Sequence, residues 1–273
     1  MNVRHATNLR SDIIESIADG ALALLKDTVK ILSSFPKYEY IVIGGWCAVL
    51  RNTTRINHPG TLDVDILFKE SSKSGYLKNV IKSFIDKGFM PSAKHSFQLL
   101  RPQIINGMRY IYNIDILHPY MTENPDEIGK FVDHLELDVP LNNSEKVLKK
   151  MKSIVLPNSE ILFRESLFDE CQKLGEVFKL VSFLGMFITK MDSCRNPKRE
   201  RDSFDIYLAF LSDGIDVNKI ETMAEGDSRI KDSLENFKTH LNEDSETFDK
   251  NVRYFCNSIE DSPANFILNK LNG

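Results

Sequence analysis

The sequence predicts a mixed α/β domain with a mixed β-sheet, followed by an α-helical domain. In the first part of the chain, short apolar runs rich in Val, Ile and Tyr alternate with amphipathic segments. Beyond about residue 165, the apolar residues recur at helical spacing. A helix before the first strand, strands that can pair in parallel and an added antiparallel pair together make a mixed sheet. We therefore expect one domain over residues 1–160 and a second, helical domain over residues 161–273.

The composition is that of an ordinary globular protein, with 42% hydrophobic and 27% charged residues. A net charge of −4 excludes a general attraction to nucleic acid, so such binding would need a local basic patch. The four cysteines are scattered without a Cys-x-x-Cys pair, which indicates free thiols in a reducing cytosol. No stretch approaches 18 apolar residues and no signal peptide is evident. We expect a cytoplasmic protein without membrane association.

The elements of the first domain follow from periodicity and from helix and turn signals. Ser11 is a suitable N-cap for an amphipathic helix that Pro36 terminates. Gly88 is a suitable C′ residue for a later helix. The expected elements are a helix at 10–34, a strand at 39–44, a strand carrying Asp63 and Asp65, a helix at 74–87, and antiparallel strands at 95–100 and 108–117 around a Pro102–Gly107 turn.

The remaining chain is expected to pass from short mixed elements to helices. Alternation predicts an edge strand at 134–139, and a short helix at 145–152 and a strand at 153–156 follow it. A continuous apolar stripe predicts one core helix over 175–191. Further helices are expected at 198–211, 216–225, 228–241, 244–259 and 263–271.

Residues 38–68 contain the pattern with the most chemical content. Gly44 and Gly45 stand between the first strand and a short helix at 46–51, where backbone N–H groups can hold a phosphate. Asp63 and Asp65 are two residues apart on a strand and therefore point to the same side. Adjacent carboxylates repel each other unless a cation lies between them, and Mg²⁺ prefers oxygen ligands of this kind.

A third carboxylate, Asp115, stands within the apolar run at 110–117. The three acids are bracketed by Leu, Val, Ile or Phe, and buried charge is costly without a counter-ion. This favours a metal site over the alternative, which is solvated acids at strand ends. For the two glycines the alternative is a plain strand-to-helix turn.

The order strand, Gly-Gly, helix, Thr61-x-Asp63-x-Asp65 and then Asp115 resembles the nucleotidyltransferase superfamily. The resemblance implies a polymerase-beta-like palm as the catalytic domain. It also implies a two-metal Mg²⁺ site, with Mn²⁺ as the alternative ion, and an NTP as substrate. The residues implied are Asp63, Asp65 and Asp115 as catalytic metal ligands, and Gly44, Gly45 and Thr61 as nucleotide-binding residues.

The resemblance extends into the second domain and is closest to the AbiEii-like type IV toxin nucleotidyltransferases. Lys190 matches the motif lysine on one helix, and Asp202 and Asp205 match the paired acids on the next. This implies that Lys190 is catalytic and contacts the β and γ phosphates, that Asp205 is catalytic and that Asp202 binds the nucleotide. It also implies the toxin of a bacterial toxin–antitoxin or abortive-infection pair, with a cognate antitoxin and a tRNA or protein acceptor.

The chain departs from the superfamily pattern at two positions. Gly45 stands where many members have serine, so a hydroxyl contact to phosphate is missing. Pro59 stands where a basic residue often precedes the aspartates, and Arg55 is the candidate substitute.

The candidate site residues of the second domain also have a structural interpretation. Lys190 is alternatively a solvated lysine at a helix end, and Asp202 an ion-pair partner of Arg199 or Arg201. A basic cluster either grips a nucleic-acid backbone such as a tRNA acceptor end or is a solvated helix face. The cluster comprises Arg195, Lys198, Arg199 and Arg201.

Four histidines of the first domain are interpreted as satisfied or surface residues: His58, His95, His118 and His134.

The function that these patterns favour is Mg²⁺-dependent transfer of an NMP from an NTP to an acceptor hydroxyl of tRNA or protein. One alternative is transfer to a small molecule, as in aminoglycoside nucleotidyltransferases. The other is a non-catalytic nucleotide-binding regulatory protein of the same fold, to which the absence of serine at Gly45 gives weight.

Overall fold

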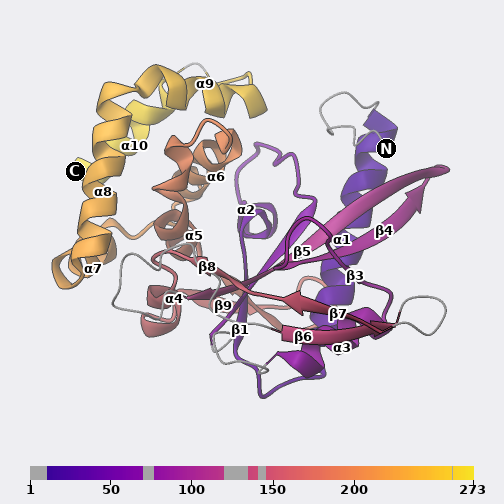
Figure 1. Cartoon of the computed structure of the whole chain (residues 1–273). Coiled ribbons are helices and arrows are strands. Elements are labelled where there is room, and N and C mark those ends of the chain that lie inside the picture. Colours follow the sequence, from indigo (N-terminus) through magenta and orange to yellow (C-terminus); the bar gives the residue numbers. More distant parts are fainter. Residues whose placement is uncertain (1–10, 70–76, 120–134, 141–145, 260) are drawn as a thin grey trace. The chain divides into compact units, whose positions relative to one another are not determined.

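The computed structural model describes residues 11–69, 77–119, 135–140, 146–259 and 261–273, which form two compact units (Figure 1). The first comprises Met1–Ile43, Gly60–Glu160 and Glu170–Leu180, and the second comprises Gly44–Pro59, Ile161–Asp169 and Val181–Gly273. The assignment of residues 1–160 and 161–273 as separate domains stays a prediction. In the parts of the chain just given, no helix has both the length and the apolar character needed to cross a bilayer.

An eight-stranded mixed sheet organises the first unit, in the order β3-β4-β5-β2-β1-β10-β9, with β8 paired to β5. β2 runs parallel to β5 and antiparallel to β1, so the predicted mixed α/β class is confirmed. The strands are β1 (Tyr40–Ile43), β2 (Asp63–Phe68), β3 (Met90–Pro91), β4 (Gln98–Ile105), β5 (Met108–Pro119), β8 (Ile154–Leu156), β9 (Phe168–Cys171) and β10 (Phe178–Val181).

Alternation gives the two central strands one apolar face and one polar face. In the register of β2 with β5, Val64 is opposite Ile114, and both side chains are fully buried. One residue further along, Asp65 is opposite Asp115, and these side chains point to the other side of the sheet. The same period of two therefore separates the hydrophobic core from the carboxylates.

Helix α1 (Ser11–Ser33) packs against β2, β4 and β5 and against α3 (Lys78–Asp86). Tyr112 of β5 donates a hydrogen bond from its hydroxyl to the carbonyl of Ile17 at 2.9 Å, so α1 covers the apolar face of the sheet. The approach at Gly20 is close, since a Cβ there would lie 2.3 Å from the Tyr112 hydroxyl oxygen. This explains a glycine in the interior of a long helix, where it otherwise costs stability.

The β4–β5 hairpin is longer than expected, and its turn takes up only the last two residues of the expected Pro102–Gly107 segment. Asn106 and Gly107 both have positive φ, 50° and 75°, and they separate Ile105 from its cross-strand partner Met108. An Asn-Gly pair is the preferred two-residue hairpin turn because both residues tolerate this conformation. Pro102, expected in the turn, instead lies within β4 opposite Ile111.

Two further segments differ from the helices expected. Residues 145–152 were expected to be helical, but β7 (Lys146–Met151) pairs antiparallel with β6 (Leu135–Pro140). In place of a single helix over 175–191, β10 pairs parallel with β1, and α5 (Phe183–Lys190) begins only after the Ser182 N-cap. A short run of buried apolar residues does not distinguish a central strand from a core helix, because both of its faces are covered.

Helices dominate the second unit, and the five expected after residue 198 are confirmed. Their core includes Phe187, whose ring packs edge-on against Phe210 and Phe237 with centroids 5.4 and 5.2 Å apart. The helices are α2 (Gly45–Arg51), α4 (Glu160–Arg164, of which the first residue belongs to the other unit), α5, α6 (Glu200–Leu211), α7 (Val217–Gly226), α8 (Ser228–Glu243), α9 (Ser245–Phe255) and α10 (Pro263–Asn272).

His118, at the end of β5, is fully buried in the first unit. Its Nδ1 lies 2.9 Å from the Ser153 hydroxyl, and its Nε2 has no hydrogen-bond partner among the described residues. Burial lowers the pKa of His118 to about 4. The histidine is therefore only partly satisfied and is held in its neutral form.

We expect His118 to make the protein sensitive to acid. Its folded pKa lies below the value of 6.5 for a free histidine, so the unfolded chain takes up the proton first. The contribution is intact above pH 6.5 and is lost as the pH falls toward 4, by up to about 3 kcal/mol. Urea unfolding of wild type and His118→Leu should therefore give a stability difference that changes over this range. His95→Gln is the control, and an equal pH dependence in His118→Leu and wild type would contradict the expectation.

Candidate active site

The polar face of β2 and β5 carries the three carboxylates predicted as metal ligands. Asp65 and Asp115 are direct neighbours on adjacent parallel strands, and Asp63 lies two residues before Asp65 on the same face. Asn113 is opposite Asp63, and Gln98 of β4 is opposite Asp115. The sheet register thus gathers side-chain oxygens from three strands on one half-buried surface.

The surroundings of Asp115 disfavour the negative charge of its carboxyl group. Burial raises the pKa of the Asp115 carboxyl, and the nearby charge of Asp63 acts in the same direction. Hydrogen bonds from Gln98 and Asn113 oppose the shift, the second with its Nδ2 2.9 Å from Asp115 Oδ1. The net result is a carboxyl with a pKa above its usual value, oriented by two neutral amides.

Asp63, the first residue of β2, is held by Thr61, which lies two residues before it in the chain. The hydroxyl of Thr61 donates a short hydrogen bond to Asp63 Oδ1, and Thr61 is itself 3% exposed. A buried hydroxyl with this partner fixes the rotamer of the carboxylate. The structure therefore shows Thr61 positioning Asp63, while its expected contact with a nucleotide stays a prediction.

The donor chemistry of this face fits a hard divalent cation. It offers carboxylate and amide oxygens, and a cation would compensate the buried charge of Asp115 and its repulsion by Asp63. Within the described ranges, however, no three Asp, Glu, His or Cys side chains are grouped closely enough to hold a metal ion. The assignment of Asp63, Asp65 and Asp115 as metal ligands stays a prediction.

In the second unit, Gly44 and Gly45 form the start of α2. Gly44 has φ 73° and ψ −147°, a conformation accessible essentially only to glycine, and Gly45 is buried at the first helical position. The sequence therefore needs glycine at residue 44 for the turn itself, whether or not a phosphate binds. The predicted phosphate contact of these residues is untested.

Lys190, Asp202 and Asp205 lie together in the second unit, in what we call the buried ion cluster. Lys190 Nζ is 2.6 Å from Asp202 Oδ1 and 2.5 Å from Asp205 Oδ2, and all three side chains are at most 5% exposed. His58 joins the cluster through Nε2, 2.8 Å from Asp205 Oδ1, and is 3% exposed. Helices α5 and α6 thus present one buried cation between two buried carboxylates.

Lys190, Asp202 and Asp205 hold one another in the charged state. Burial by itself lowers the pKa of Lys190, but Asp205 and Asp202 outweigh it and hold that pKa above its usual value. Burial acts to raise the pKa of Asp205, and Lys190 and His58 outweigh it, so that this pKa is far below its usual range. Asp202 is shifted in the same direction by Lys190 and Arg199.

This geometry decides between the structural interpretations offered by the sequence. Lys190 is not a solvated lysine, because its ammonium group is buried between two carboxylates. Asp202 does pair with Arg199, with Nε 2.8 Å from Oδ2, as the ion-pair interpretation expected. The catalytic and nucleotide-binding roles implied for Lys190, Asp202 and Asp205 remain untested.

Two residues of the basic cluster already have acidic partners. Arg195 pairs with Asp192 at 2.9 Å, and Arg199 pairs with Asp202. Lys198 is exposed. The predicted grip on a nucleic-acid backbone is therefore carried by fewer available charges than the sequence suggests, and it stays a prediction.

Several site residues were not identified from the sequence. Asn113 lies two residues before Asp115 and shares its strand face, so the period of two could have found it. Gln98 and His58 could not be found in this way. Gln98 reaches Asp115 through hairpin register, and His58 reaches Asp205 across 147 residues of chain.

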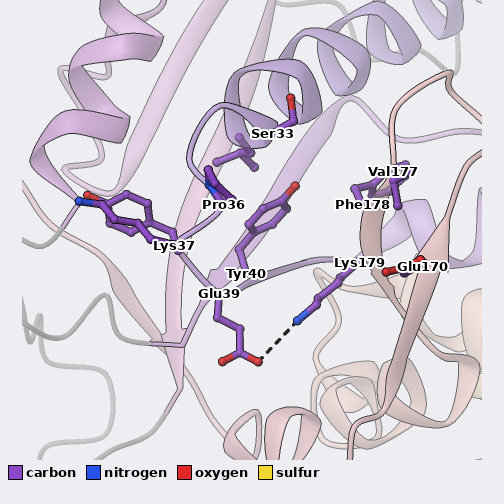
Figure 2. A pocket seen from close by; sticks show the side chains of 11 residues that line it. Ser33, Pro36, Lys37, Glu39, Tyr40, Glu170, Val177, Phe178 and Lys179 are labelled. Carbon is purple, nitrogen blue, oxygen red and sulfur yellow. Dashed lines mark ion pairs between the residues drawn. The ribbon is translucent and has the colours of Figure 1, made fainter.

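A separate hollow of about 550 Å³ lies in the first unit beside β1 and β10 (Figure 2). Figure 2 shows Tyr40 and Phe178 beside it and the ion pair of Glu39 with Lys179, whose nearest atoms are 3.6 Å apart. Glu39 also pairs with Lys69 at 2.9 Å. Glu39 and Lys179 thus neutralise each other at the lining of this hollow, and none of the predicted site residues lines it.

No protein-family model matches the chain, and no curated protein matches it. Among solved structures, the chain is similar to an antigenic nucleotidyltransferase-like protein from Paracoccidioides brasiliensis. That likeness has 14% sequence identity and a TM-score of 0.38, and it covers 88% of this chain and 94% of the other. Because both measures are low, no argument about this chain rests on it.

Proposed function

We propose that the protein is a Mg²⁺-dependent nucleotidyltransferase that transfers an NMP from an NTP to an acceptor hydroxyl and releases pyrophosphate. The observation that carries the proposal is the polar face of β2 and β5, where Asp65 is opposite Asp115 and Asp63 lies two residues before Asp65 on the same face. The order of the glycines and aspartates in the sequence supports the same class.

We call the surface formed by Asp63, Asp65 and Asp115 the carboxylate face, and the proposal assigns a task to each of its residues. Bound Mg²⁺ would supply charge neutralisation for the triphosphate and lower the pKa of the attacking hydroxyl. Asp63 and Asp65 hold the cation, and Thr61 keeps Asp63 in the required rotamer. Asp115 orients the acceptor hydroxyl and accepts its proton, for which a raised carboxyl pKa is suitable. Positioning and charge neutralisation are the main contributions to phosphoryl transfer.

The finer assignments belong to the same proposal. By resemblance to the AbiEii-like group, the acceptor is tRNA or a protein and the biological role is that of a toxin with a cognate antitoxin. Gly44 and Gly45 hold the triphosphate, and Lys190, Asp202 and Asp205 complete the nucleotide side. None of these assignments follows from the geometry alone.

A second candidate function is supported by the buried ion cluster. Lys190, the residue expected to reach the phosphates, is occupied by two carboxylates. A non-catalytic nucleotide-binding protein would keep such a cluster for stability. It would not need Asp63, Asp65 and Asp115 together on one face.

The test is label transfer with purified full-length protein. We would incubate it with Mg²⁺ and each α-labelled NTP in turn, offering total tRNA, cell extract or an aminoglycoside panel as acceptor. Wild type should transfer label, and Asp63→Ala/Asp65→Ala should not. The matched control is Asp19→Ala/Asp86→Ala, which removes two exposed helix carboxylates from the same unit.

The outcomes separate the two candidates. Label that appears in an acceptor with wild type and control only supports nucleotidyl transfer and identifies the acceptor class. Nucleotide-dependent thermal stabilisation without label transfer, unchanged by Asp65→Asn, supports the binding protein instead. If the protein shows neither label transfer nor nucleotide-dependent stabilisation, both candidates are refuted.

A further inference from the structure

A hollow of about 300 Å³ in the first unit is lined mainly by positive and hydroxyl side chains from three elements. Lys30 belongs to α1, and Ser34 directly follows that helix. Ser83 belongs to α3, Lys87 is the C-cap of α3, and Arg101 belongs to β4. Among the described residues that line it, Asp27 is the one that carries a carboxylate. Its volume is at the lower end of the range for small-ligand pockets.

The positive charges of this hollow are not balanced by the surrounding protein. Asp27 pairs with Arg101, whose Nη2 is 3.5 Å from Oδ2. In the part of the chain that the structure describes, the ammonium groups of Lys30 and Lys87 have no ion-pair or hydrogen-bond partner. Three cations against one carboxylate leave two positive charges facing a concave surface, in a chain of net charge −4. A lining of one sign raises the local concentration of anions.

Arg101 is held in place as a donor. Its guanidinium lies 4.8 Å from the centroid of the Phe89 ring and donates a short hydrogen bond to the Lys87 carbonyl. With Asp27 on its other terminal nitrogen, the group is fixed on three sides. A guanidinium has five N–H donors, so N–H groups remain for a ligand after these two contacts. The side chain is thus pre-oriented before any anion arrives.

The lining selects a phosphate over a single carboxylate. Two uncompensated positive charges match the charge of a phosphate dianion, and the hydroxyl of Ser83 adds a neutral donor. Charge-assisted hydrogen bonds from Arg and Lys to phosphate oxygens are among the stronger contacts in proteins. We infer that this hollow is a phosphate-binding site, for either a free phosphate or pyrophosphate ion or a backbone phosphate of a nucleic acid.

The site is separate from the carboxylate face. Arg101 is opposite Tyr112 in the hairpin, and Tyr112 points to α1, on the apolar side of the sheet. Asp115 points to the other side. The contrast with the hollow beside β1 and β10 is equally clear, because there Glu39 is paired with both Lys69 and Lys179. The inference therefore stands independently of the proposed catalytic function.

The test compares two lysine pairs that differ only in their position on the same two helices. Lys30→Gln/Lys87→Gln removes the unpaired charges of the hollow. Lys26→Gln/Lys82→Gln removes two exposed lysines of α1 and α3 that do not line it. Both are made in the full chain on an Asp63→Asn/Asp65→Asn background and measured in EDTA, so that the proposed metal site makes no contribution. Thermal melts confirm that both pairs are folded.

Binding is measured by equilibrium dialysis with labelled inorganic phosphate and pyrophosphate, and by fluorescence anisotropy with a labelled RNA 12-mer of arbitrary sequence. The hollow pair should weaken binding of one of these probes at least about tenfold, since two charge-assisted contacts are lost. The control pair should stay within about twofold of the parent, as expected for screened surface charges.

Each outcome decides the inference. Loss of phosphate or pyrophosphate binding in the hollow pair alone supports it and identifies a free phosphate ligand. Loss confined to the RNA probe supports it and identifies a nucleic-acid backbone. Equal weakening in both pairs, or no binding of any probe at millimolar concentration, would overturn it. The proposed nucleotidyl transfer is unaffected by any of these results, because its own test uses Mg²⁺ and the wild-type aspartates.

Discussion

Replacing Lys190 by methionine is expected to lower the free energy of unfolding by about 3–5 kcal/mol, the cost of breaking a buried ion pair by removing one partner. The substitution leaves Asp202 and Asp205 facing each other in a site where both are at most 3% exposed. Arg199 compensates only Asp202, and it is itself 56% exposed. Urea denaturation monitored by circular dichroism measures the change.

Two further variants identify the cause of that loss. Lys198→Met changes an exposed lysine nearby and should shift the unfolding free energy by no more than about 0.5 kcal/mol. Adding Asp202→Asn and Asp205→Asn to Lys190→Met removes the unpaired charges and should recover most of the stability. If Lys190→Met is no more harmful than Lys198→Met, the cluster is not buried in solution. If the triple variant recovers nothing, the loss comes from packing and not from charge.

The triple variant also separates stability from function. Because it has no charge at residue 190, it cannot place a cation on an NTP phosphate. A folded triple variant that still transfers label would show that Lys190 serves the fold. A folded triple variant that has lost transfer would support the role that the resemblance implies.

Replacing Asp115 by asparagine is expected to have opposite effects on activity and on metal-free stability. Label transfer should fall by at least about a hundredfold, as for the loss of a general base. Without divalent metal, the variant should be more stable than wild type at pH 7 by up to about 1 kcal/mol, the scale of a cross-strand like-charge contact. The amide has almost the same shape as the carboxyl and carries no charge to repel Asp63.

The pH dependence of this difference has a definite sign. The pKa of Asp115 is raised in the folded state, so its contribution to stability is present at low pH and is lost as the pH rises through that pKa. The advantage of Asp115→Asn should therefore be absent in acid and should grow toward neutrality. Thermal melts in EDTA at several pH values measure it, with Asp86→Asn, an exposed acid of α3, as control. A variant that is less stable than wild type at pH 7 would contradict a crowded carboxylate face.

Most helices of this protein could be predicted from the sequence because their stabilising contacts are local. The helix over 10–34 and those after residue 198 repeat apolar residues every three or four positions, and Ser182, Asp216, Asp227 and Ser262 accept N-capping hydrogen bonds in the structure. The same alternation predicted Asp63 and Asp65 on one face. It also indicated that Asp115 lies on a buried strand.

Register and long-range pairing could not be predicted in the same way. β10 is a strand because β1 offers it a parallel edge, whereas its own apolar run fits a helix equally well. The hairpin turns at Asn106 and Gly107, and the two residues at that turn determine which residue of β4 is opposite Asp115. These choices depend on hydrogen bonds between segments that are far apart in sequence.

By itself, the sequence determined the α/β class, most of the helices and the alternation that separates the carboxylates from the core, because each of these depends on the period of a local element. Only the tertiary structure decided that Asp65 is opposite Asp115, that His58 and Lys190 are buried with Asp205, and that Lys30, Lys87 and Arg101 line one hollow. Their positions depend on how separate elements pack. No local pattern in the chain records that packing.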